Sequence, residues 1–475
     1  ALSRIEAILD DNSFVEIGAA VTARATDFNM QEKKAPSDGV ITGYGVVNGN
    51  LVYVYSQDAA VLGGTIGEMH AKKIASLYEK AMKMGAPVIG LIDCAGLRLQ
   101  EATDALNGFG EIYKNMSLAS GIIPQITAVY GECGGGLAVL AELSDFVFVE
   151  EKKAKLFVNS PNALDGNYES KLDTSSAKFM AEAGVADFAG DEETIANGVR
   201  QLVSMLPSNN TEGTVCTDNQ DDLNRVCADM AAEIADPALA LTDISDDGVF
   251  VETKAEYAKE MVTGFILVDG VTVGAVANRT ALYDENGEKA EEFAPVLTTA
   301  GAYKAAEFVT FCNAFEIPVL TLTNIKGFEA TVKSERTIAK ASAKLVYAFA
   351  NADVPKVNVI TGEAYGSAYV AMNSKSIGAD MVYAWPQASI GMMDASSAAK
   401  IMYADDIAAS KDAAATINEK AAEYAALQSS VDQAAARGYV DTIINPEDTR
   451  KYVIAAFEML FDKREVRADK KHGTV

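Results

Sequence analysis

The chain repeats its own layout, and this repetition constrains the fold more than any other feature of the sequence. An apolar run opens at Pro87 and leads into residues 93–97. The same arrangement returns 231 positions later, where a run opens at Pro318 and leads into residues 324–328.

A second pair of segments keeps this spacing. Pro124 opens an apolar run that ends in the glycine-rich turn 131–136, and Pro355 opens one that ends in the turn 361–367. Chance does not produce such agreement over four segments. A duplicated chain with two similar glycine turns predicts one site built from two copies of a single anion-stabilising device.

The length of the chain agrees with this duplication. With 475 residues it is too long for one hydrophobic core and fits two domains. The composition changes abruptly in residues 206–248, which are rich in Asp, Asn, Ser and Thr. We therefore expect domains at 1–235 and 236–475, joined by a structured connector that carries a helix near residues 223–234.

The net charge limits the classes of partner. A formal charge of −27 argues against nucleic acid, because phosphate binding needs a basic surface. A local basic pocket for a small polyanion stays open, with Lys72, Lys73 and Arg98 as candidates, and the alternative is that these are ordinary surface charges.

Cysteine and histidine usage narrows the chemistry. The five cysteines are odd in number and lack CxxC spacing, which favours a reducing cytoplasm and indicates no metal site. Cys94 lies in the segment 93–97 and Cys133 in the glycine turn 131–136, and packing is the expected role of a free cysteine at both places. The only histidines are His70 and His472, which argues against a histidine-based triad.

Local patterns predict an α/β fold. Residues 40–55 and 261–276 each form two β-rich runs around a short turn, which is typical of a hairpin. Residues 68–84 have helical spacing, and residues 408–436 are alanine-rich and read as one long helix. The sequence has no long uncharged apolar run, so it predicts no transmembrane helix.

The glycine turns carry the chemistry. A strand that ends in glycines and opens a helix presents backbone N–H groups at the positive end of the helix dipole. Such groups can hold a phosphate or a developing oxyanion. The glycines lack the spacing of a dinucleotide fingerprint and of a phosphate loop. The alternative is that glycines 134–136 only permit close helix–strand packing.

Residues 93–101 followed by the turn 131–136 resemble the carboxyltransferase of biotin-dependent acyl-CoA carboxylases and decarboxylases. This family includes the propionyl-CoA carboxylase β subunit, the methylmalonyl-CoA decarboxylase α subunit and the large transcarboxylase subunit. The resemblance runs through nearly the whole chain and includes residues 13–18, 67–74, 365–369, 384–386 and 470–473.

The resemblance implies a duplicated crotonase-like fold of the ClpP/crotonase ββα superhelix type. The N-terminal domain would take the acyl-CoA and the C-terminal domain the biotin. In this family the biotin ureido anion left by CO2 release takes the α-proton of the acyl-CoA. The protein then needs only backbone N–H donors for two oxyanions, which suits a chain without a catalytic histidine.

Site residues follow by matching positions to the family motifs. Gly135 and Gly136 would serve the thioester, and Ser367 and Ala368 the biotin. Further substrate contacts are expected from Ala95, Gly96, Gly134, Gly327, Phe328 and Gly366, with no metal. In a superposition of the halves we expect Gly96 over Gly327, and the turn 134–136 over 366–368.

Two departures concern the second half. The family usually has a second glycine where this chain has Ser367, and Asp-Val-Pro-Gly-Phe where it has residues 324–328. Ser367 keeps its backbone N–H but adds a hydroxyl beside the expected biotin site. Lys326 reads as a surface charge or as a contact for a substrate carboxylate.

One short motif is misleading. Residues 81–84 match the tetrapeptide around a biotinylated lysine, but Lys83 is expected at the end of a helix rather than on a hairpin tip. The expected partners are therefore a separate biotin carboxyl carrier protein and either a biotin carboxylase or a membrane decarboxylase subunit. The family also implies a cytoplasmic homo-oligomer, a dimer or a trimer of dimers, peripheral to a membrane complex in the decarboxylase case.

Other functions stay open at this point. A crotonase-type hydratase or isomerase would share the oxyanion holes but need a side-chain base such as Glu132 or Glu101. A non-catalytic assembly subunit would explain Ser367 and Asn324. Within the family, a glutaconyl- or malonyl-CoA-specific decarboxylase subunit is a further alternative to the propionyl/methylmalonyl-CoA assignment.

Overall fold

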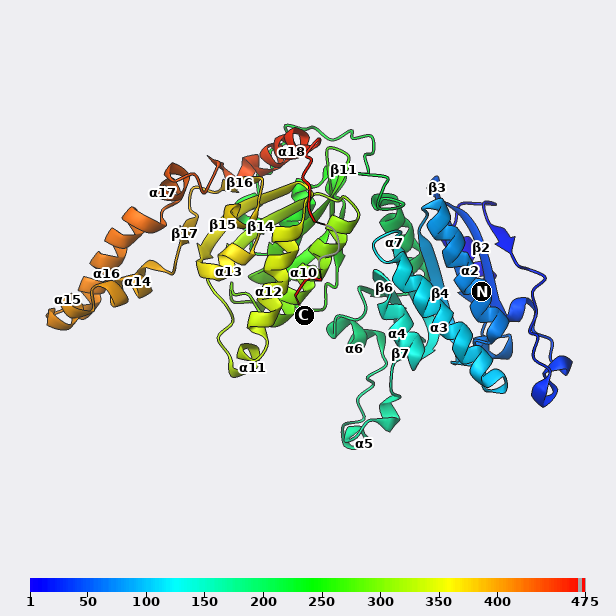
Figure 1. The fold of residues 1–475 in the computed structure, drawn as a ribbon. Helices are drawn as coiled ribbons and strands as arrows, with labels where there is room; N and C mark the ends of the chain where they lie inside the picture. The colour runs from blue at the N-terminus through cyan, green and yellow to red at the C-terminus, as the bar shows by residue number, and fades with distance from the viewer. Residues whose placement is uncertain (469–471, 475) are drawn as a thin grey trace. The chain divides into compact units, whose positions relative to one another are not determined.

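The structure, a computed structural model, describes residues 1–468 and 472–474. It divides into two compact units, shown in the ribbon of Figure 1. The first contains Ala1–Val215 with Lys254–Tyr257, and the second contains Cys216–Thr253 with Ala258–Val475. Lys470 and Lys471, part of the family-like segment 470–473, lie outside the described residues.

The first unit is built on one mixed sheet in the order β1-β2-β3-β4-β5-β6-β8, with β7 beside β5. The first three strands pair antiparallel, and the pairs from β3 onward are parallel. The strands are β1 (Val15–Ile17), β2 (Val40–Val47), β3 (Asn50–Gln57), β4 (Val88–Cys94), β5 (Gln125–Gly134), β6 (Phe146–Glu150), β7 (Lys155–Phe157) and β8 (Phe188–Gly190).

Helices cover this sheet because each crossover between parallel strands needs one. The long helix α2 (Glu68–Met84) packs beside α3 (Ala102–Ala119), and it buries Ile74, Leu77 and Ala81 as predicted. The other helices are α1 (Leu2–Ile8), α4 (Gly136–Glu142), α5 (Asn167–Ser170), α6 (Ala177–Glu182) and α7 (Glu192–Met205). Lys83 lies exposed in the last turn of α2, before the left-handed C-cap Gly85, as predicted.

The second unit repeats this plan in the sheet order β18-β16-β15-β14-β11-β10-β9, with β17 beside β15. A small ribbon pairs β12 with β13. The strands are β9 (Phe250–Thr253), β10 (Met261–Val268), β11 (Val271–Asn278), β12 (Ala281–Tyr283), β13 (Lys289–Glu292), β14 (Val319–Ile325), β15 (Lys356–Tyr365), β16 (Met381–Ala384), β17 (Ser389–Gly391) and β18 (Thr442–Ile443).

Two helices cover this second sheet as α2 and α3 cover the first, and they pack against each other: α10 (Thr299–Ala314) and α12 (Ile338–Asn351). Trp385 is fully buried in the core of this unit and donates its indole N–H to the hydroxyl of Thr449. The remaining helices are α8 (Met230–Glu233), α9 (Pro237–Ile244), α11 (Val332–Glu335), α13 (Gly366–Ala371), α14 (Ala395–Met402), α15 (Ala404–Ala409), α16 (Ala413–Tyr424), α17 (Val431–Ala436) and α18 (Thr449–Leu460).

The duplication is confirmed element by element. Strand bounds of β4 and β14, and of β5 and β15, differ by the same 231 positions that the sequence shows. Both expected hairpins are present, as β2–β3 and β10–β11, and they repeat at a shorter offset of 221. The two units are therefore copies of one α/β layer that differ by insertions between the hairpin and the parallel strands.

Two helices were predicted wrongly. The alanine-rich segment 408–436 is not one helix, because it contains the end of α15, then α16, a π-helical turn at Ala425–Ser429 and α17. Asp412 and Ser430 cap the new helix starts by accepting the N–H groups of Ala415 and Gln433. In the connector, the expected helix near residues 223–234 shrinks to α8.

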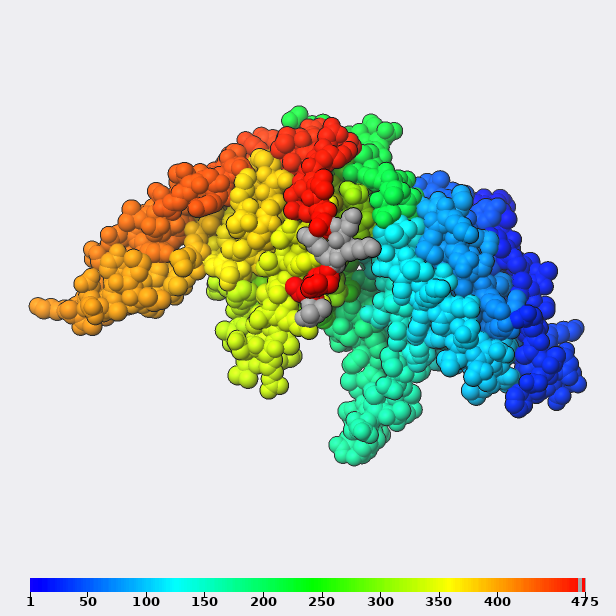
Figure 2. All heavy atoms as spheres, viewed as in Figure 1, coloured from blue at the N-terminus to red at the C-terminus, as the bar shows by residue number. Residues whose placement is uncertain are grey.

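The broken helices project from the body of the second unit. Figure 1 shows α14, α15 and α16 extending away from the sheet, and Figure 2 shows the same segment in orange as a protruding arm. Ile401, Met402 and Leu427 on this arm are mostly exposed. In the described part of the chain, no helix is both long and apolar enough to cross a membrane.

Candidate active site

The first candidate turn lies where β4 and β5 end. These strands are parallel neighbours, so their carboxyl ends meet at the same edge of the sheet. β5 passes into α4 through Gly135, whose φ of +64° is a left-handed conformation that favours glycine. The turn therefore lies at a helix start, as predicted.

The second candidate turn has the same geometry. β14 and β15 are parallel, and β15 passes into α13 at Gly366, which also has a φ of +64°. The matched strand bounds and φ values make Gly366 the counterpart of Gly135. The expected pairing of residues 134–136 with 366–368 was therefore wrong by one residue, and the partners of 134–136 are 365–367.

A close approach between neighbouring strands supports each turn. In β5 a Cβ on Gly131 would collide with the carboxylate of Asp93, and in β15 a Cβ on Gly362 would collide with the amide of Asn324. Both contacts occur at a register shift between the two strands. In each unit, a glycine therefore leaves room for the Asp or Asn side chain of the neighbouring strand. The ends of the two parallel strands are packed in the same way in both units.

Hydrogen bonds decide which N–H groups of the first turn can reach a ligand. Gly135 donates its N–H to the carbonyl of Phe157 at 2.8 Å, and Ala95 donates to Gly63 at 3.0 Å. Gly136 begins α4, and an N–H at that position has no partner within the helix. Among the described residues, the Gly96 N–H has the Cys94 thiol sulfur as its acceptor, at 3.4 Å, and sulfur is a weak acceptor.

The position of Gly136 is set by two aromatic residues of α3. A Cβ on Gly136 would come within 2.8 Å of the Phe109 ring and 3.0 Å of the Tyr113 hydroxyl. Tyr113 donates this hydroxyl to the Gly136 carbonyl at 2.6 Å, which fixes the peptide that follows the turn. Burial raises the pKa of Tyr113, so the hydroxyl keeps its proton near neutral pH.

A Tyr113→Phe variant is expected to lower kcat about three- to tenfold, because one neutral hydrogen bond contributes about 0.5–1.5 kcal/mol. The melting temperature should change little, since Phe retains the ring packing against Phe109. Steady-state carboxyl exchange and thermal unfolding measure the two effects. Ser117→Ala, which removes a hydroxyl bonded to Tyr113 O on the same helix, is the control and should retain full activity.

The second turn presents different side chains on the same backbone. Ser367 is exposed at the second position of α13, whereas Ala368 is buried. Lys326 donates its backbone N–H to Pro295 at 2.8 Å, and Gly327 accepts from Leu297 at 2.8 Å. Phe328 remains partly exposed beside this turn.

Counterpart side chains at the two turns carry different charges. Asp93 forms an ion pair with Arg4 at 2.9 Å, and the Arg4 guanidinium also lies over the Tyr130 ring. Its counterpart Asn324 is neutral and accepts the backbone N–H of Glu363. Sequence reasoning missed both Arg4 and Tyr113, because no local pattern links them to residues so distant in sequence.

The expected basic pocket is only partly assembled. Lys72 and Lys73 line one small cavity of about 220 Å³ on α2. Arg98 is absent from its lining, because it is buried in ion pairs with Asp38 and Glu101. The ammonium of Lys73 is bonded to the carbonyls of Ser37 and Val40. The three cations therefore do not form one site.

Most of the side chains considered for acid–base or thiol chemistry are either buried or bonded to other residues of the fold. Glu101 is held by Arg98 and by the N–H of Glu68. His70 is fully buried beside Asp38, and burial lowers its pKa to about 3, which keeps it neutral. Burial also raises the pKa of the Cys94 thiol to about 11, in agreement with a packing role. Glu132 is exposed at the first turn.

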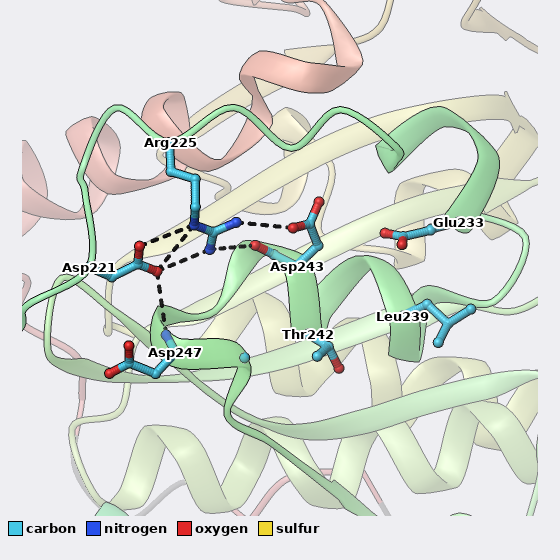
Figure 3. A pocket seen from close by; sticks show the side chains of 8 residues that line it. Asp221, Arg225, Glu233, Leu239, Thr242, Asp243 and Asp247 are labelled. Carbon is cyan, nitrogen blue, oxygen red and sulfur yellow. Dashed lines mark hydrogen bonds and ion pairs between the residues drawn. The ribbon is translucent and has the colours of Figure 1, made fainter. Parts of the chain in front are cut away.

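A larger cavity, of about 480 Å³, lies in the connector and is lined by none of the turn residues. Figure 3 shows that Arg225 in this cavity is already paired with Asp221 and Asp243. Buried Arg450 bonds Asp221 and Asp246 close by. These ion pairs stabilise the connector, and among the described residues the cation that lines this cavity, Arg225, is already paired.

Comparison with known proteins agrees with the geometry. A model of the carboxyl transferase domain matches residues 1–475. The methylmalonyl-CoA decarboxylase α subunit of Propionigenium modestum is 39% identical, with 100% of this chain and 92% of the relative covered. The propionyl-CoA carboxylase β chain of Roseobacter denitrificans is 38% identical, with 100% and 93% covered.

Among solved structures, a transcarboxylase 12S hexamer with methylmalonyl-coenzyme A and methylmalonic acid bound is 35% identical. It superposes with a TM-score of 0.92, covering 100% of this chain and 91% of the other. The two units are therefore crotonase-like, and the chain has a carboxyltransferase fold. It belongs to the carboxyl transferase domain family, and its function is that of a carboxyltransferase rather than of a hydratase or isomerase.

Proposed function

We propose that this chain moves a carboxyl group between biotin on a separate carrier protein and a short-chain acyl-CoA such as propionyl- or methylmalonyl-CoA. One observation carries the proposal: two helix-start turns with the same backbone geometry occupy the same place in both units. Each turn can stabilise one oxyanion, and this reaction forms two.

The first turn is assigned to the thioester. Gly136 and Gly96 are the proposed donors, since the N–H groups of Gly135 and Ala95 are bonded elsewhere. Gly135 contributes its left-handed backbone, and Gly134 lies against the Phe157 ring, where no side chain fits. The enolate oxygen that develops during the reaction is the group these donors stabilise.

The second turn is assigned to biotin. Ser367 is its proposed donor through the backbone N–H, with Ala368 next in the first turn of α13. Gly366 and Gly327 shape the backbone, and the exposed part of Phe328 offers an apolar surface for the fused ring. These residues fit a neutral ureido group whose oxygen becomes anionic when CO2 leaves.

The proposed reaction needs no side-chain base. Release of CO2 from the carboxylated ureido nitrogen leaves an anion on the ureido group, and this anion takes the α-proton of the acyl-CoA. The resulting enolate then forms a carbon–carbon bond with CO2. The chain orients both substrates and stabilises both oxyanions, which agrees with buried, neutral His70 and paired Glu101.

The domain roles and partners follow from this assignment. Residues 1–235 would form the acyl-CoA side and residues 236–475 the biotin side. The proposed partners are a biotin carboxyl carrier protein with a biotin carboxylase or a membrane decarboxylase subunit, in the cytoplasm or at a membrane complex. A homo-oligomer is also proposed, supported by the hexamer of the transcarboxylase 12S structure.

Carboxyl exchange between free biotin and acyl-CoA thioesters tests the function. The purified chain should transfer the carboxyl group from methylmalonyl-CoA to biotin, and comparison with malonyl- and glutaconyl-CoA ranks the substrates. Crotonyl-CoA hydration should be undetectable. A chain that hydrates crotonyl-CoA and leaves biotin unchanged would contradict the proposal.

Lys83 should carry no biotin. It lies in the last turn of α2, so its backbone is helical. A biotin ligase modifies a lysine at an exposed hairpin tip, and the helix does not offer that conformation. Mass spectrometry of protein co-expressed with a biotin ligase measures this directly, with a known carrier domain as the positive control. A biotin-sized mass increment on the Lys83 peptide would show that the helix does not protect it.

A further inference from the structure

The duplication shows where this chain has added a charge to one of its two turns. Lys326 follows β14 in the second unit, and its counterpart at the 231-residue offset is Ala95 after β4 in the first. The backbone donates equivalent hydrogen bonds at both positions, from Ala95 to Gly63 and from Lys326 to Pro295. The turns are thus alike in backbone and differ in side chain.

The Lys326 side chain is exposed, while its backbone is anchored. Within the described residues its ammonium has no ion-pair partner, although the chain carries a net charge of −27. The acidic residues of the same turns, Glu329 and Glu363, form no ion pair with it. The ammonium is therefore available to a ligand.

The placement of charges differs between the two turns. In the first, the Asp93 carboxylate is neutralised by Arg4. In the second, neutral Asn324 replaces this pair, and Lys326 adds a positive charge. Glu132 and Glu363 are counterparts and contribute equally. Glu329 offsets Lys326 in the net charge of the second turn but forms no ion pair with it, so this turn presents, within the described part of the chain, an exposed, unpaired ammonium where its copy has Ala95. That ammonium can bind a ligand that is anionic before the reaction begins.

We propose that the Lys326 ammonium binds the carboxylate of the group in transfer while that group is on biotin, an inference that rests on the proposed function. The thioester carbonyl assigned to the first turn is neutral in its ground state, whereas the group assigned to the second turn, carboxylated biotin, carries a carboxylate beside its ureido oxygen. A lysine provides a point charge on a flexible stem. Lys326 forms and breaks no covalent bond in this role.

The test compares Lys326→Ala, which copies Ala95, with Lys326→Arg and with the wild-type chain. Lys333→Ala is the matched control, because Lys333 is an exposed lysine on the neighbouring helix α11. Decarboxylation of methylmalonyl-CoA is measured with biotin amide as acceptor, so that the substrate carries the only carboxylate. We expect kcat to fall about tenfold or more in Lys326→Ala.

The kinetic constants separate the two sources of the carboxylate. If it is bound on biotin, KM for methylmalonyl-CoA stays unchanged while kcat falls, and Lys326→Arg recovers most activity. If KM rises with kcat unchanged, the lysine contacts the acyl-CoA carboxylate and the proposal is wrong. Equal activity of Lys326→Ala and Lys333→Ala would also overturn it.

A second readout does not depend on rate. Acetylation of Lys326 by an amine-reactive reagent, followed by peptide mass spectrometry, should be slowed by methylmalonyl-CoA with biotin amide. It should not be slowed by propionyl-CoA with biotin amide, which lacks the carboxylate. Absence of protection overturns the Lys326 proposal. A wild-type chain with no biotin-dependent activity would instead overturn the proposed function.

Discussion

A Gly136→Val variant should lose carboxyl transfer by at least a hundredfold while remaining folded. The introduced Cβ would lie 2.8 Å from the Phe109 ring and 3.0 Å from the Tyr113 hydroxyl, closer than packed atoms allow. The start of α4 is expected to shift to relieve this contact, and the Gly136 N–H would then no longer lie where it is proposed to bind the thioester oxygen. Loss of one oxyanion-hole donor typically costs about 2.7–4 kcal/mol of transition-state stabilisation.

The control for Gly136→Val is Gly110→Ala in helix α3. A Cβ at Gly110 meets open space, so this variant should keep full activity and be slightly more stable. Biotin exchange measures activity, and circular dichroism with thermal unfolding tests folding of both variants. Near-normal activity in a folded Gly136→Val protein would show that the assignment of Gly136 to the thioester site is wrong.

Mixing variants tests the proposed homo-oligomer. The family resemblance implies that the acyl-CoA turn of one chain works with the biotin turn of another. A Gly136→Val chain mixed with a Ser367→Pro chain should then regain part of the activity, since one complete pair of turns survives in each heterodimer. Sedimentation of an active monomer would contradict this arrangement.

Much of the fold could be predicted because the relevant signals are local. The Asn48-Gly49 turn, the helical spacing of residues 68–84 and the strands that open after Pro87 and Pro318 were all confirmed. The alanine-rich segment was mispredicted because its high average helix propensity does not show where single capping residues start new helices. Asp412 and Ser430 satisfy N–H groups at new helix starts and divide the segment.

The candidate site was harder to predict in detail. Its two turns were located, but matching glycine with glycine paired residue 134 with 366, whereas the strand bounds pair 135 with 366. The bond from Gly135 to Phe157 removes an expected donor, and no sequence pattern reveals a hydrogen bond to another strand. The same holds for Tyr113 and Arg4, whose partners come from distant segments.

Ser367 should matter through its backbone rather than through its hydroxyl. Its N–H lies in the first turn of α13, where it makes no intrahelical hydrogen bond, and it is the proposed donor to the biotin ureido oxygen. Ser367→Pro removes this N–H and should lower carboxyl transfer about a hundredfold or more. Proline is tolerated at a helix start, so α13 should still form.

Ser367→Gly is the matched variant, because it deletes the hydroxyl and keeps the N–H. It should retain most of the transfer activity, measured as exchange between methylmalonyl-CoA and biotin. Binding of propionyl-CoA, measured by calorimetry, should be nearly unchanged in both variants, because the thioester is assigned to Gly136 and Gly96. If Ser367→Gly abolished activity while thioester binding persisted, the hydroxyl itself would take part in the reaction, and a backbone donor alone would no longer explain the second turn.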